Sequence, residues 1–272
     1  MPTAPLTDKL HRAQDILRDL GSVIVAFSGG IDSTLVLKLA HDTLGEQAVA
    51  VTAVSPTLPE AELEATRRIA AEIGAAHRLV KTDQLEIPEF VVNDASRCYH
   101  CKTDLYSLLG ALRRADQFAH IVDGTNMDDL GDDRPGLKAA REWGVRSPLL
   151  EAELSKGEVR TLAKELGLSN WDKPAAACLS SRVPRGMTIT RATLSRVDRA
   201  ESVLAREGFR HCRVRDHGEI ARIEVAAEDC ARLLDDARRN RVAQELKALG
   251  YRFVTLDLEG YRQGGVSLTS PA

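Results

Sequence analysis

A loop with the chemistry of a pyrophosphate site lies near the N-terminus. An apolar run over residues 23–27 leads into Ser28-Gly29-Gly30-Ile31-Asp32-Ser33-Thr34, and Leu and Ala then recur at helical spacing. Two adjacent glycines let the backbone bend tightly and approach a ligand without a Cβ in the way. Ser28, Ser33 and Thr34 add hydroxyl donors, and the unpaired N–H groups at a helix N-terminus favour an anion. The pattern therefore predicts a strand, a pyrophosphate-binding loop and a helix.

This loop differs from two common phosphate-binding motifs. It lacks the terminal Gly-Lys-Ser/Thr of a Walker loop and the three-glycine spacing of a dinucleotide fingerprint. The alternative is a glycine turn that binds nothing, but the strand–loop–helix context favours a ligand site. Asp32 would lie beside the phosphates, where a carboxylate is favourable through a bridging Mg²⁺. The alternative for Asp32 is a carboxylate placed at a helix start because the helix dipole stabilises it there.

Three cysteines have the context for chemistry at sulfur. Cys98 and Cys101 form a C-x-x-C pair just before a predicted helix over residues 102–113, and Cys178 lies in a segment rich in serine and arginine. The pair alone fits half a zinc site, a redox dithiol, part of an iron–sulfur site, or two inert thiols. A thiol near cations tends toward the thiolate, which attacks electrophiles or binds metal. Cys212 and Cys230 fall in strand and helix patterns, and we assign them to ordinary packing.

The elements that must position the loop alternate between strand and helix patterns. Strands are predicted over residues 23–27, 49–54, 77–81 and 120–123, with a helix over 60–73. This alternation predicts an α/β fold with a parallel sheet covered on both faces. Ligands of such sheets bind at the carboxyl ends of the strands. Both the glycine loop and Gly124-Thr125-Asn126 fall at such ends, so we expect Gly124 and Asn126 to frame a nucleotide.

The pattern changes in the second half of the chain. After a helix over residues 155–166, the order from Thr190 onward is helix, strand, strand, helix, helix, strand. The strands are predicted over residues 210–215, 219–225 and 252–257. This order predicts a small C-terminal α+β domain. We place the boundary near residue 170, which gives domains 1–170 and 171–272.

Composition narrows the class of protein. Of 272 residues, 43% are hydrophobic and 28% charged, and the net charge is −3, which gives no bulk attraction to nucleic acid. No apolar run is as long as a membrane span, and residues 1–10 lack a hydrophobic signal core. Five cysteines without dense spacing do not form a secreted disulfide framework. We expect a cytoplasmic protein with no nucleic-acid or membrane partner.

Five segments, in order along nearly the whole chain, resemble the LarE family of ATP-dependent sulfur transferases. They are the loop at 28–34, Arg97-Cys98-Tyr99-His100-Cys101-Lys102, Asp123-Gly124-Thr125-Asn126 with Asp128-Asp129 and Arg134-Pro135-Gly136, Ala177-Cys178-Leu179-Ser180-Ser181-Arg182, and Asp257-Leu258-Glu259-Gly260-Tyr261-Arg262. The resemblance implies a PP-loop ATP pyrophosphatase domain of the adenine nucleotide alpha hydrolase-like type. It also implies that Mg-ATP adenylates a carboxylate of pyridinium-3,5-biscarboxylic acid mononucleotide, and that sulfur displaces AMP to give a thiocarboxylate. The product belongs to the biosynthesis of the nickel-pincer nucleotide cofactor of lactate racemase.

The resemblance offers two sources of sulfur. In one, Cys178 forms an adduct, gives up its own sulfur and ends as dehydroalanine. In the other, Cys98, Cys101 and Cys178 hold a [4Fe-4S] cluster whose uncoordinated iron carries an extra sulfide. Three thiolates leave one iron of a cubane open, which suits a transferable sulfide. We favour the cluster, because a sacrificial mechanism requires Cys178 alone.

The resemblance and the chemistry of the ligands together assign the remaining residues. ATP and Mg²⁺ would be bound by Ser28, Gly29, Gly30, Asp32, Ser33, Thr34, Gly124 and Asn126. The mononucleotide carries a phosphate and two carboxylates, so we expect it to contact Ser181, Arg182, Arg213 and Arg215. Arg213 and Arg215 alternate on a predicted strand and would share one face. By resemblance, Glu201 and Glu224 would bind a divalent ion near that phosphate, and we expect a homo-oligomer.

Three rival functions stay open at this point. A tRNA-thiolating PP-loop enzyme would need a basic patch or an RNA-binding module. The predicted C-terminal domain does contain several arginines, but the acidic net charge argues against this function. An amide-forming synthetase that uses ammonia would leave the cysteines without a role. A non-catalytic module that senses ATP would release no pyrophosphate with any substrate.

Overall fold

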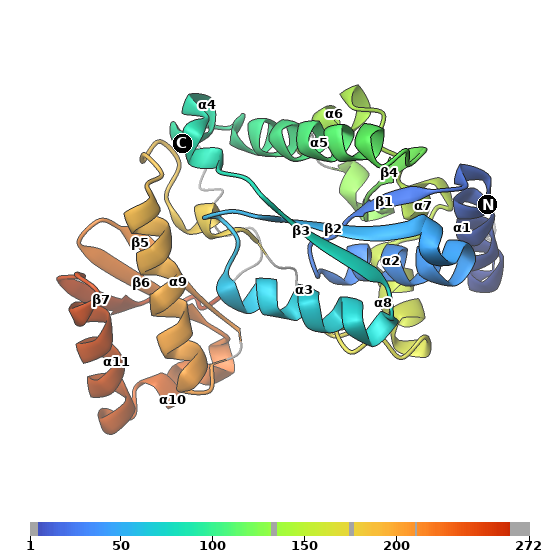
Figure 1. Ribbon diagram of the computed structural model, residues 1–272. Coiled ribbons are helices and arrows are strands. Elements are labelled where there is room, and N and C mark those ends of the chain that lie inside the picture. Colours follow the sequence, from blue (N-terminus) through green and yellow to red (C-terminus); the bar gives the residue numbers. More distant parts are fainter. Residues whose placement is uncertain (1–4, 132–134, 174–176, 210, 262–272) are drawn as a thin grey trace. The chain divides into compact units, whose positions relative to one another are not determined.

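The protein folds into two compact units, shown in the computed structural model of Figure 1, which describes residues 5–131, 135–173, 177–209 and 211–261. The first unit comprises residues 1–84 and 96–176, and the second comprises residues 85–95 and 177–272. The chain therefore passes between the units after residues 84, 95 and 176. Arg134, Arg210 and Arg262, which belong to segments discussed above, lie outside the described residues.

The first unit contains a parallel sheet of four strands in the order β3-β2-β1-β4. The strands are β1 (Val23–Ala26), β2 (Ala48–Val54), β3 (Ala76–Lys81) and β4 (His120–Val122). Val23 pairs with Ala48 on one side and with His120 on the other, so β1 is central. Strands buried on both faces read as near-continuous apolar runs, as β1 does and as β2 does apart from Thr52. The predicted parallel sheet is confirmed.

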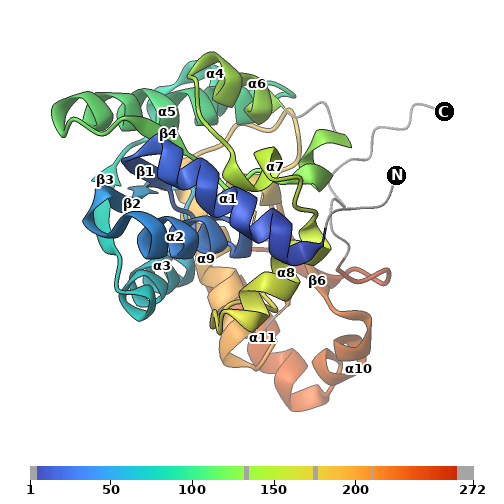
Figure 2. The same cartoon turned by 90° about the vertical axis from the view of Figure 1, so that its right-hand side faces the viewer.

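Helices cover both faces of this sheet. They are α1 (Leu6–Leu20), α2 (Ile31–Leu44), α3 (Glu60–Ile73), α5 (Arg97–Ala115), α6 (Pro135–Glu142), α7 (Pro148–Glu151) and α8 (Lys156–Glu165), with short 3-10 turns η1 (Gly45–Gln47), η2 (Gln84–Glu86) and η3 (Met127–Gly131). Val23 and Val25 pack into one core with α1, α2, α3, α7 and α8, and Figure 2 shows α1 beside α2 and α7. Ile24 and Val49 pack into a second core with α5 and α6. Successive strand residues alternate between the two cores because a strand has a side-chain period of two.

The start of α5 corrects one prediction. The cysteine pair was expected to precede a helix beginning at residue 102, but α5 begins at Arg97 and includes both Cys98 and Cys101. No glycine or proline interrupts residues 97–101, and Ser96 occupies the N-cap position. Nothing in that stretch therefore delays the helix. The two thiols lie in its first turns.

The second unit contains a smaller sheet in the order β5-β6-β7. Strand β5 (Cys212–His217) is antiparallel to β6 (Ile220–Val225), and β7 (Phe253–Leu256) is parallel to β6. Its helices are α4 (Pro88–Val91), α9 (Arg191–Arg206), α10 (Cys230–Leu233) and α11 (Asp236–Ala248), with 3-10 turns η4 (Leu179–Arg182) and η5 (Ala227–Asp229). A core that includes Phe209, Val214, Ile223 and Leu246 joins α9, α10 and α11 to the sheet. The predicted order from Thr190 onward is confirmed.

Residues 85–95 join the second unit through the side chain of Asn93. Asn93 is fully buried and has a φ of 61°, in the left-handed region that asparagine tolerates better than most residues. Its amide nitrogen donates to the carbonyls of Val183, Pro184 and Met187, at 3.3, 2.8 and 3.0 Å. The chain five residues before Cys98 is thus fastened to the chain that follows Cys178. None of the helices in the described ranges is long and apolar enough to cross a bilayer.

Candidate functional site: a nucleotide pocket and two cysteine segments

A cavity of about 460 Å³ opens in the first unit at the carboxyl ends of β1, β2 and β4. The glycine loop forms one wall, and β4 is followed there by Gly124 and Thr125. Residues from α5 form another part of the lining. This is the place where ligands of parallel α/β sheets bind. The structure therefore brings together two of the segments that the sequence assigned to ATP.

The loop has the geometry of an anion site. Gly29 has a φ of 71°, and a Cβ there would lie 2.9 Å from Cγ2 of Thr66. Ser28 and Ser33 line the cavity, with their hydroxyl oxygens 3.2 Å apart. Gly30 is the N-cap of α2, so the free N–H groups of the first helical turn face the loop. Thr34 is fully buried, and its hydroxyl accepts a hydrogen bond from the Asn170 amide at 2.9 Å, so it supports the loop from behind.

Asp32 lies at the centre of a small polar network. Its Oδ1 accepts from the Asn126 amide at 3.0 Å, and its Oδ2 forms an ion pair with Lys156. The structure thus places Asn126 against the loop, although 94 positions separate it from Asp32. Sequence reasoning missed Lys156. One signal could have found it, because a lysine as the first residue of α8 opposes the helix dipole and needs a local reason.

Asp123 fixes the turn that follows β4. Its carboxylate is only 7% exposed and accepts four hydrogen bonds. The donors are the Tyr106 hydroxyl (3.0 Å), the Thr125 amide and hydroxyl (3.1 and 3.0 Å), and the Ser147 hydroxyl (2.7 Å). Burial, and then the neighbouring Asp123, raise the pKa of Tyr106, which stays a donor. Asp123 therefore holds Gly124 and Thr125 in place at the cavity.

The cysteine pair shares a helix face with the cavity lining. Lys102, Leu105 and Tyr106 of α5 line the cavity. Cys98 precedes Lys102 by four residues and Cys101 precedes Leu105 by four, and residues at this spacing lie one above the other on a helix. Cys98 is exposed and Cys101 is half-buried. Both thiols therefore lie about one turn from the cavity.

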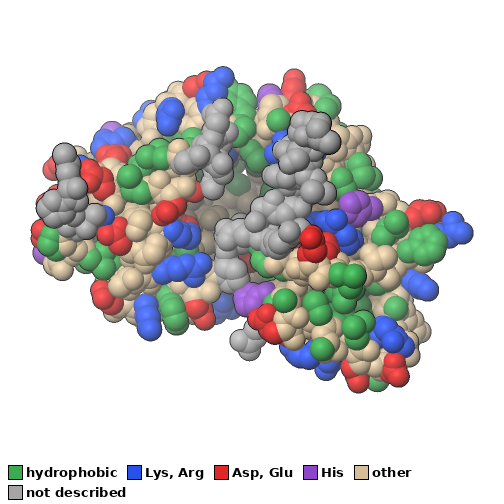
Figure 3. All heavy atoms as spheres, turned by 180° about the vertical axis from the view of Figure 1, so that it is seen from behind, with side chains coloured by type: hydrophobic (Ala, Val, Ile, Leu, Met, Phe, Trp, Pro, Cys, Tyr) green, Lys and Arg blue, Asp and Glu red, His purple; other side chains and the backbone are tan. Residues whose placement is uncertain are grey.

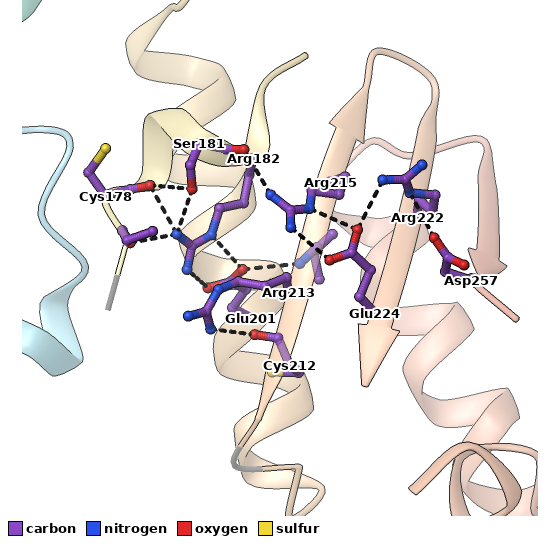
Figure 4. Close-up of polar contacts among 12 residues, drawn as sticks. Cys178, Ser181, Arg182, Glu201, Cys212, Arg213, Arg215, Arg222, Glu224 and Asp257 are labelled. Carbon is purple, nitrogen blue, oxygen red and sulfur yellow. Dashed lines mark hydrogen bonds and ion pairs between the residues drawn. The ribbon is translucent and has the colours of Figure 1, made fainter. Parts of the chain in front are cut away.

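In the second unit, hydrogen bonds hold the turn that carries Cys178 (Figure 4). Its carbonyl oxygen accepts from the Ser181 amide at 3.0 Å, the Ser181 hydroxyl at 2.9 Å and Nη1 of Arg182 at 2.9 Å. The guanidinium of Arg182 is 2% exposed and binds both carboxylate oxygens of Glu201, at 2.9 and 2.8 Å. Burial alone would lower the pKa of Arg182, but the hydrogen bonds with Glu201 outweigh it and raise the pKa. Arg182 stays charged.

A second buried ion pair lies beside this turn. Arg215 donates to both carboxylate oxygens of Glu224, at 2.9 and 2.8 Å, and its Nη1 donates to the Ser181 carbonyl at 2.9 Å. Arg222 adds a further donor to Glu224 at 2.9 Å. Arg213 is only half-buried, and its guanidinium lies 5.2 Å from the ring centre of Tyr261. Arg182 and Arg215 thus donate to the main chain of the turn, whereas Arg213 donates to the Cys212 carbonyl at 2.7 Å.

Glu201 and Glu224, which were expected to bind a divalent ion, instead accept hydrogen bonds from protein groups. Glu201 binds Arg182 and also accepts from the Val214 amide at 3.0 Å, and Glu224 binds two arginines. Across the described ranges, no group of three or more His, Cys, Asp or Glu side chains could hold a metal ion.

Burial, and then Glu201, raise the pKa of Cys212 to about 12, so this thiol is unreactive at neutral pH.

Charge is mixed over the face of the molecule shown in Figure 3. Acidic and basic side chains alternate there over both units, with apolar side chains between them. The described residues on this face form no continuous basic stripe of the kind that tracks a nucleic-acid backbone.

Comparison with known proteins decides the family. The asparagine synthase family model matches residues 7–116. A protein of Lactiplantibacillus plantarum, pyridinium-3,5-bisthiocarboxylic acid mononucleotide synthase, is 44% identical over 268 residues, which cover 98% of this chain and 96% of its own. The chain belongs to the LarE family. The resemblance drawn from the five segments is confirmed, and the protein is a PP-loop enzyme of ATP-dependent sulfur transfer.

Two other relatives of this LarE protein differ in how much of the chain they match. An uncharacterized protein of Synechocystis is 46% identical over 259 residues, covering 95% of this chain and 97% of that protein. A subunit of the glutamine-hydrolysing GMP synthase of Archaeoglobus fulgidus is 25% identical over 158 residues, or 54% of this chain and 52% of its own. The first similarity extends over the cysteine segments and the second unit, whereas the second covers about half the chain.

Proposed function

We propose that this LarE protein uses ATP to adenylate a carboxylate of pyridinium-3,5-biscarboxylic acid mononucleotide and converts it to a thiocarboxylate. The reaction would serve the biosynthesis of the nickel-pincer nucleotide cofactor of lactate racemase. The observation that carries the proposal is the placement of Cys98 and Cys101 on the face of α5 that lines the nucleotide pocket. The pocket in which ATP activates the substrate and the thiols that take part in sulfur delivery would thus lie within about one helical turn of each other. The name of the Lactiplantibacillus relative supports the same product.

The pocket supplies the groups that activation needs. A carboxylate is a poor electrophile because its leaving group would be oxide, and adenylation replaces that group with AMP. Ser28, Ser33 and the amides at the start of α2 would hold the phosphates. Asp32 and Asp129 both line the cavity, and carboxylate oxygens are the ligands that Mg²⁺ prefers. These two carboxylates would hold Mg²⁺, which would neutralise phosphate charge, and Lys156, which is paired with Asp32, would supply a second cation there.

For the sulfur source we propose that Cys98, Cys101 and Cys178 hold a [4Fe-4S] cluster. Three thiolates leave one iron open, and the bound cluster would supply a transferable sulfide there. Two observations on the chain support this fit. Cys98 and Cys101 are accessible thiols on one helix face, and Asn93 fastens the chain before Cys98 to the chain after Cys178.

The alternative sulfur source is the Cys178 side chain itself, and a separate observation is consistent with it. The Cys178 carbonyl accepts three donors, an arrangement that suits loss of the Cys178 sulfur itself. Cys98→Ala distinguishes the two sources. It abolishes multiple turnover if a cluster delivers sulfur, and it leaves a single turnover if Cys178 is consumed. Cys230→Ala, in the second unit, is the matched control and changes neither.

We also propose how the mononucleotide is bound. Arg213 is half-buried, so its guanidinium can contact the phosphate or a carboxylate, together with the Ser181 hydroxyl. Arg182 and Arg215 would act less directly, by holding the main chain of the turn between them. Glu201 and Glu224 keep these two guanidinium groups in place.

Transfer of labelled oxygen tests the activation step. The mononucleotide carrying ¹⁸O in its carboxylates is incubated with Mg-ATP, and the nucleotide products are analysed by mass spectrometry. Adenylation transfers one ¹⁸O to AMP, because the carboxylate oxygen attacks the α-phosphorus and stays with AMP when sulfur displaces it. Label in orthophosphate, or in no product, contradicts the proposal.

A further inference from the structure

We infer that Asn170 and Lys173 are positioning residues for ATP, which hold the peptide between Gly29 and Gly30 with its N–H toward the phosphates. Both lie in the segment that follows α8, 141 and 144 positions from Gly29. The inference rests on the proposed function in taking the glycine loop as the phosphate site. Ligand binding tests it without turnover.

The peptide between Gly29 and Gly30 lies at the edge of the cavity. Ser28 and Gly30 line the cavity, whereas Gly29 is buried against Thr66 of α3. The C=O and N–H of a trans peptide point in opposite directions, so a Gly29 carbonyl that points away from the cavity aims the Gly30 N–H toward it. The Gly30 nitrogen lies 3.4 Å from the Ser28 hydroxyl oxygen, a long hydrogen bond that a charged phosphate oxygen can replace.

Two consecutive glycines make this peptide easy to turn over. Neither residue has a Cβ that opposes rotation about the bonds on either side of the peptide. After such a rotation the Gly29 carbonyl oxygen would face the phosphates, and its partial negative charge would repel them, whereas a backbone N–H attracts them. The loop therefore needs partners outside the cavity that bind the Gly29 carbonyl and hold it there.

Asn170 binds this carbonyl from behind the loop. Its side chain is buried, and its amide nitrogen donates to the Gly29 carbonyl at 3.1 Å and to the Thr34 hydroxyl at 2.9 Å. The amide cannot be turned the other way, because its oxygen would then face a carbonyl that only accepts. That oxygen is buried and has no hydrogen-bond partner among the described residues. A buried unpaired oxygen costs stability, so the two donors of Asn170 account for an amide at this position.

Lys173 brings a positive charge to the same carbonyl. Its ammonium lies 3.5 Å from the Gly29 oxygen and forms an ion pair with Glu62 at 2.6 Å. Glu62 precedes Thr66 by one turn of α3, so one face of this helix supports both the loop and the lysine. A hydrogen bond of 3.0 Å from the Lys173 amide to the Asn170 carbonyl closes a turn that holds the two donors together.

Asn170→Leu tests this role without a change of charge, since leucine is similar in size to asparagine but has no donor. We expect the Kd for ATP and for inorganic pyrophosphate with Mg²⁺ to rise about tenfold, equivalent to about 1.4 kcal/mol or one lost hydrogen bond. The Kd for adenosine, which carries no phosphate, should stay unchanged. Calorimetry on the full chain measures all three. Asn170→Ala removes the same donors without added volume, and it decides the question if Asn170→Leu does not fold.

Lys173→Met should raise the Kd for pyrophosphate about threefold, less than Asn170→Leu does, because the lysine contact with the carbonyl is longer. Lys164→Met is its matched control, since it removes an exposed lysine of α8 that lies over the Trp171 ring. Equal effects of the two lysine variants overturn the role of Lys173.

Three results overturn the inference as a whole. They are unchanged pyrophosphate binding in the Asn170 variants, an equal loss of adenosine binding in them, and no pyrophosphate binding by the wild type. Failure of the proposed function would instead appear as absence of AMP formation by a protein that binds ATP normally.

Discussion

A Cβ on Gly124 would lie 2.6 Å from the backbone nitrogen of Ser33. The turn after β4 and the first turn of α2 therefore approach each other so closely that only glycine fits between them. This contact sets the distance between the phosphate loop and the turn held by Asp123. Gly124 is required because no Cβ fits in this space. Gly29 is required both for space and because its φ is positive.

Gly124→Ala should therefore push the turn away from the loop. The atoms that the added Cβ would meet include the Ser33 nitrogen and the Asp32 carbonyl carbon at 2.8 Å, and backbone atoms cannot move aside cheaply. We expect pyrophosphate release to fall about 100-fold and the unfolding midpoint to drop, as for overpacking of a dense site. Gly157→Ala is the control, because a Cβ there meets nothing within 4 Å. Wild-type activity in Gly124→Ala would show that the two segments need not touch.

Lys156→Met should weaken ATP binding more than it weakens folding. It leaves Asp32 without its cation beside the expected phosphates, so like charges repel. We expect the KM for ATP to rise about tenfold, equivalent to about 1.4 kcal/mol. Lys38→Met removes a lysine that is paired with Asp42 on the surface of α2, and it should leave the KM unchanged. Steady-state assays at varied ATP compare the two, and equal effects would assign Lys156 no role at the phosphates.

Asn93→Gly should impair sulfur delivery while leaving activation intact. Glycine tolerates the φ of 61°, so the variant removes the hydrogen bonds to Val183, Pro184 and Met187 without adding backbone strain. We expect iron content after anaerobic reconstitution to fall severalfold, with ATP binding unchanged by calorimetry. Asn93→Asp retains the shape but replaces the donor with an acceptor, and it should lose at least as much iron. Full iron occupancy in both variants would show that Asn93 is not needed for binding of the cluster.

His77 should make the first unit less stable in mild acid. Burial, and then Arg67, lower the pKa of His77 from 6.5, so the unfolded chain binds a proton more readily than the folded one. Stability is therefore complete above about pH 6.5 and falls as the pH drops toward the folded-state pKa. The Thr52 hydroxyl donates to the Phe27 carbonyl at 2.8 Å, so Nε2 of His77 donates to Thr52 at 2.9 Å, a bond that glutamine can replace.

Urea unfolding of wild type and His77→Gln at a series of pH values checks this expectation. The difference in the free energy of unfolding between the two proteins should shift in favour of His77→Gln as the pH falls below about 6.5. A difference that does not change with pH would show that His77 has the same pKa in the folded and unfolded states.

The sequence predicted those features that leave a local pattern. Strand β1 reads as an unbroken apolar run and β2 as one interrupted only by Thr52, and the glycine loop follows β1 directly. The role of Asn93 leaves no such pattern, because one buried amide ties together residues about 90 positions apart. Lys156 does leave a local signal, as a lysine at the first position of α8, but its partner Asp32 lies 124 positions away and could not be read from the sequence. The sequence also suggested Arg182 and Arg215 as ligands of the substrate, but a pattern of arginines does not reveal that their donors reach main-chain carbonyls.

The products formed from ATP test the central claim most directly. The protein is incubated with Mg-ATP and pyridinium-3,5-biscarboxylic acid mononucleotide, and nucleotides and phosphates are separated by ion-exchange chromatography. Our account predicts AMP and pyrophosphate in equal amounts, formed only when the mononucleotide is present. ADP and orthophosphate, or no cleavage of ATP, would contradict it.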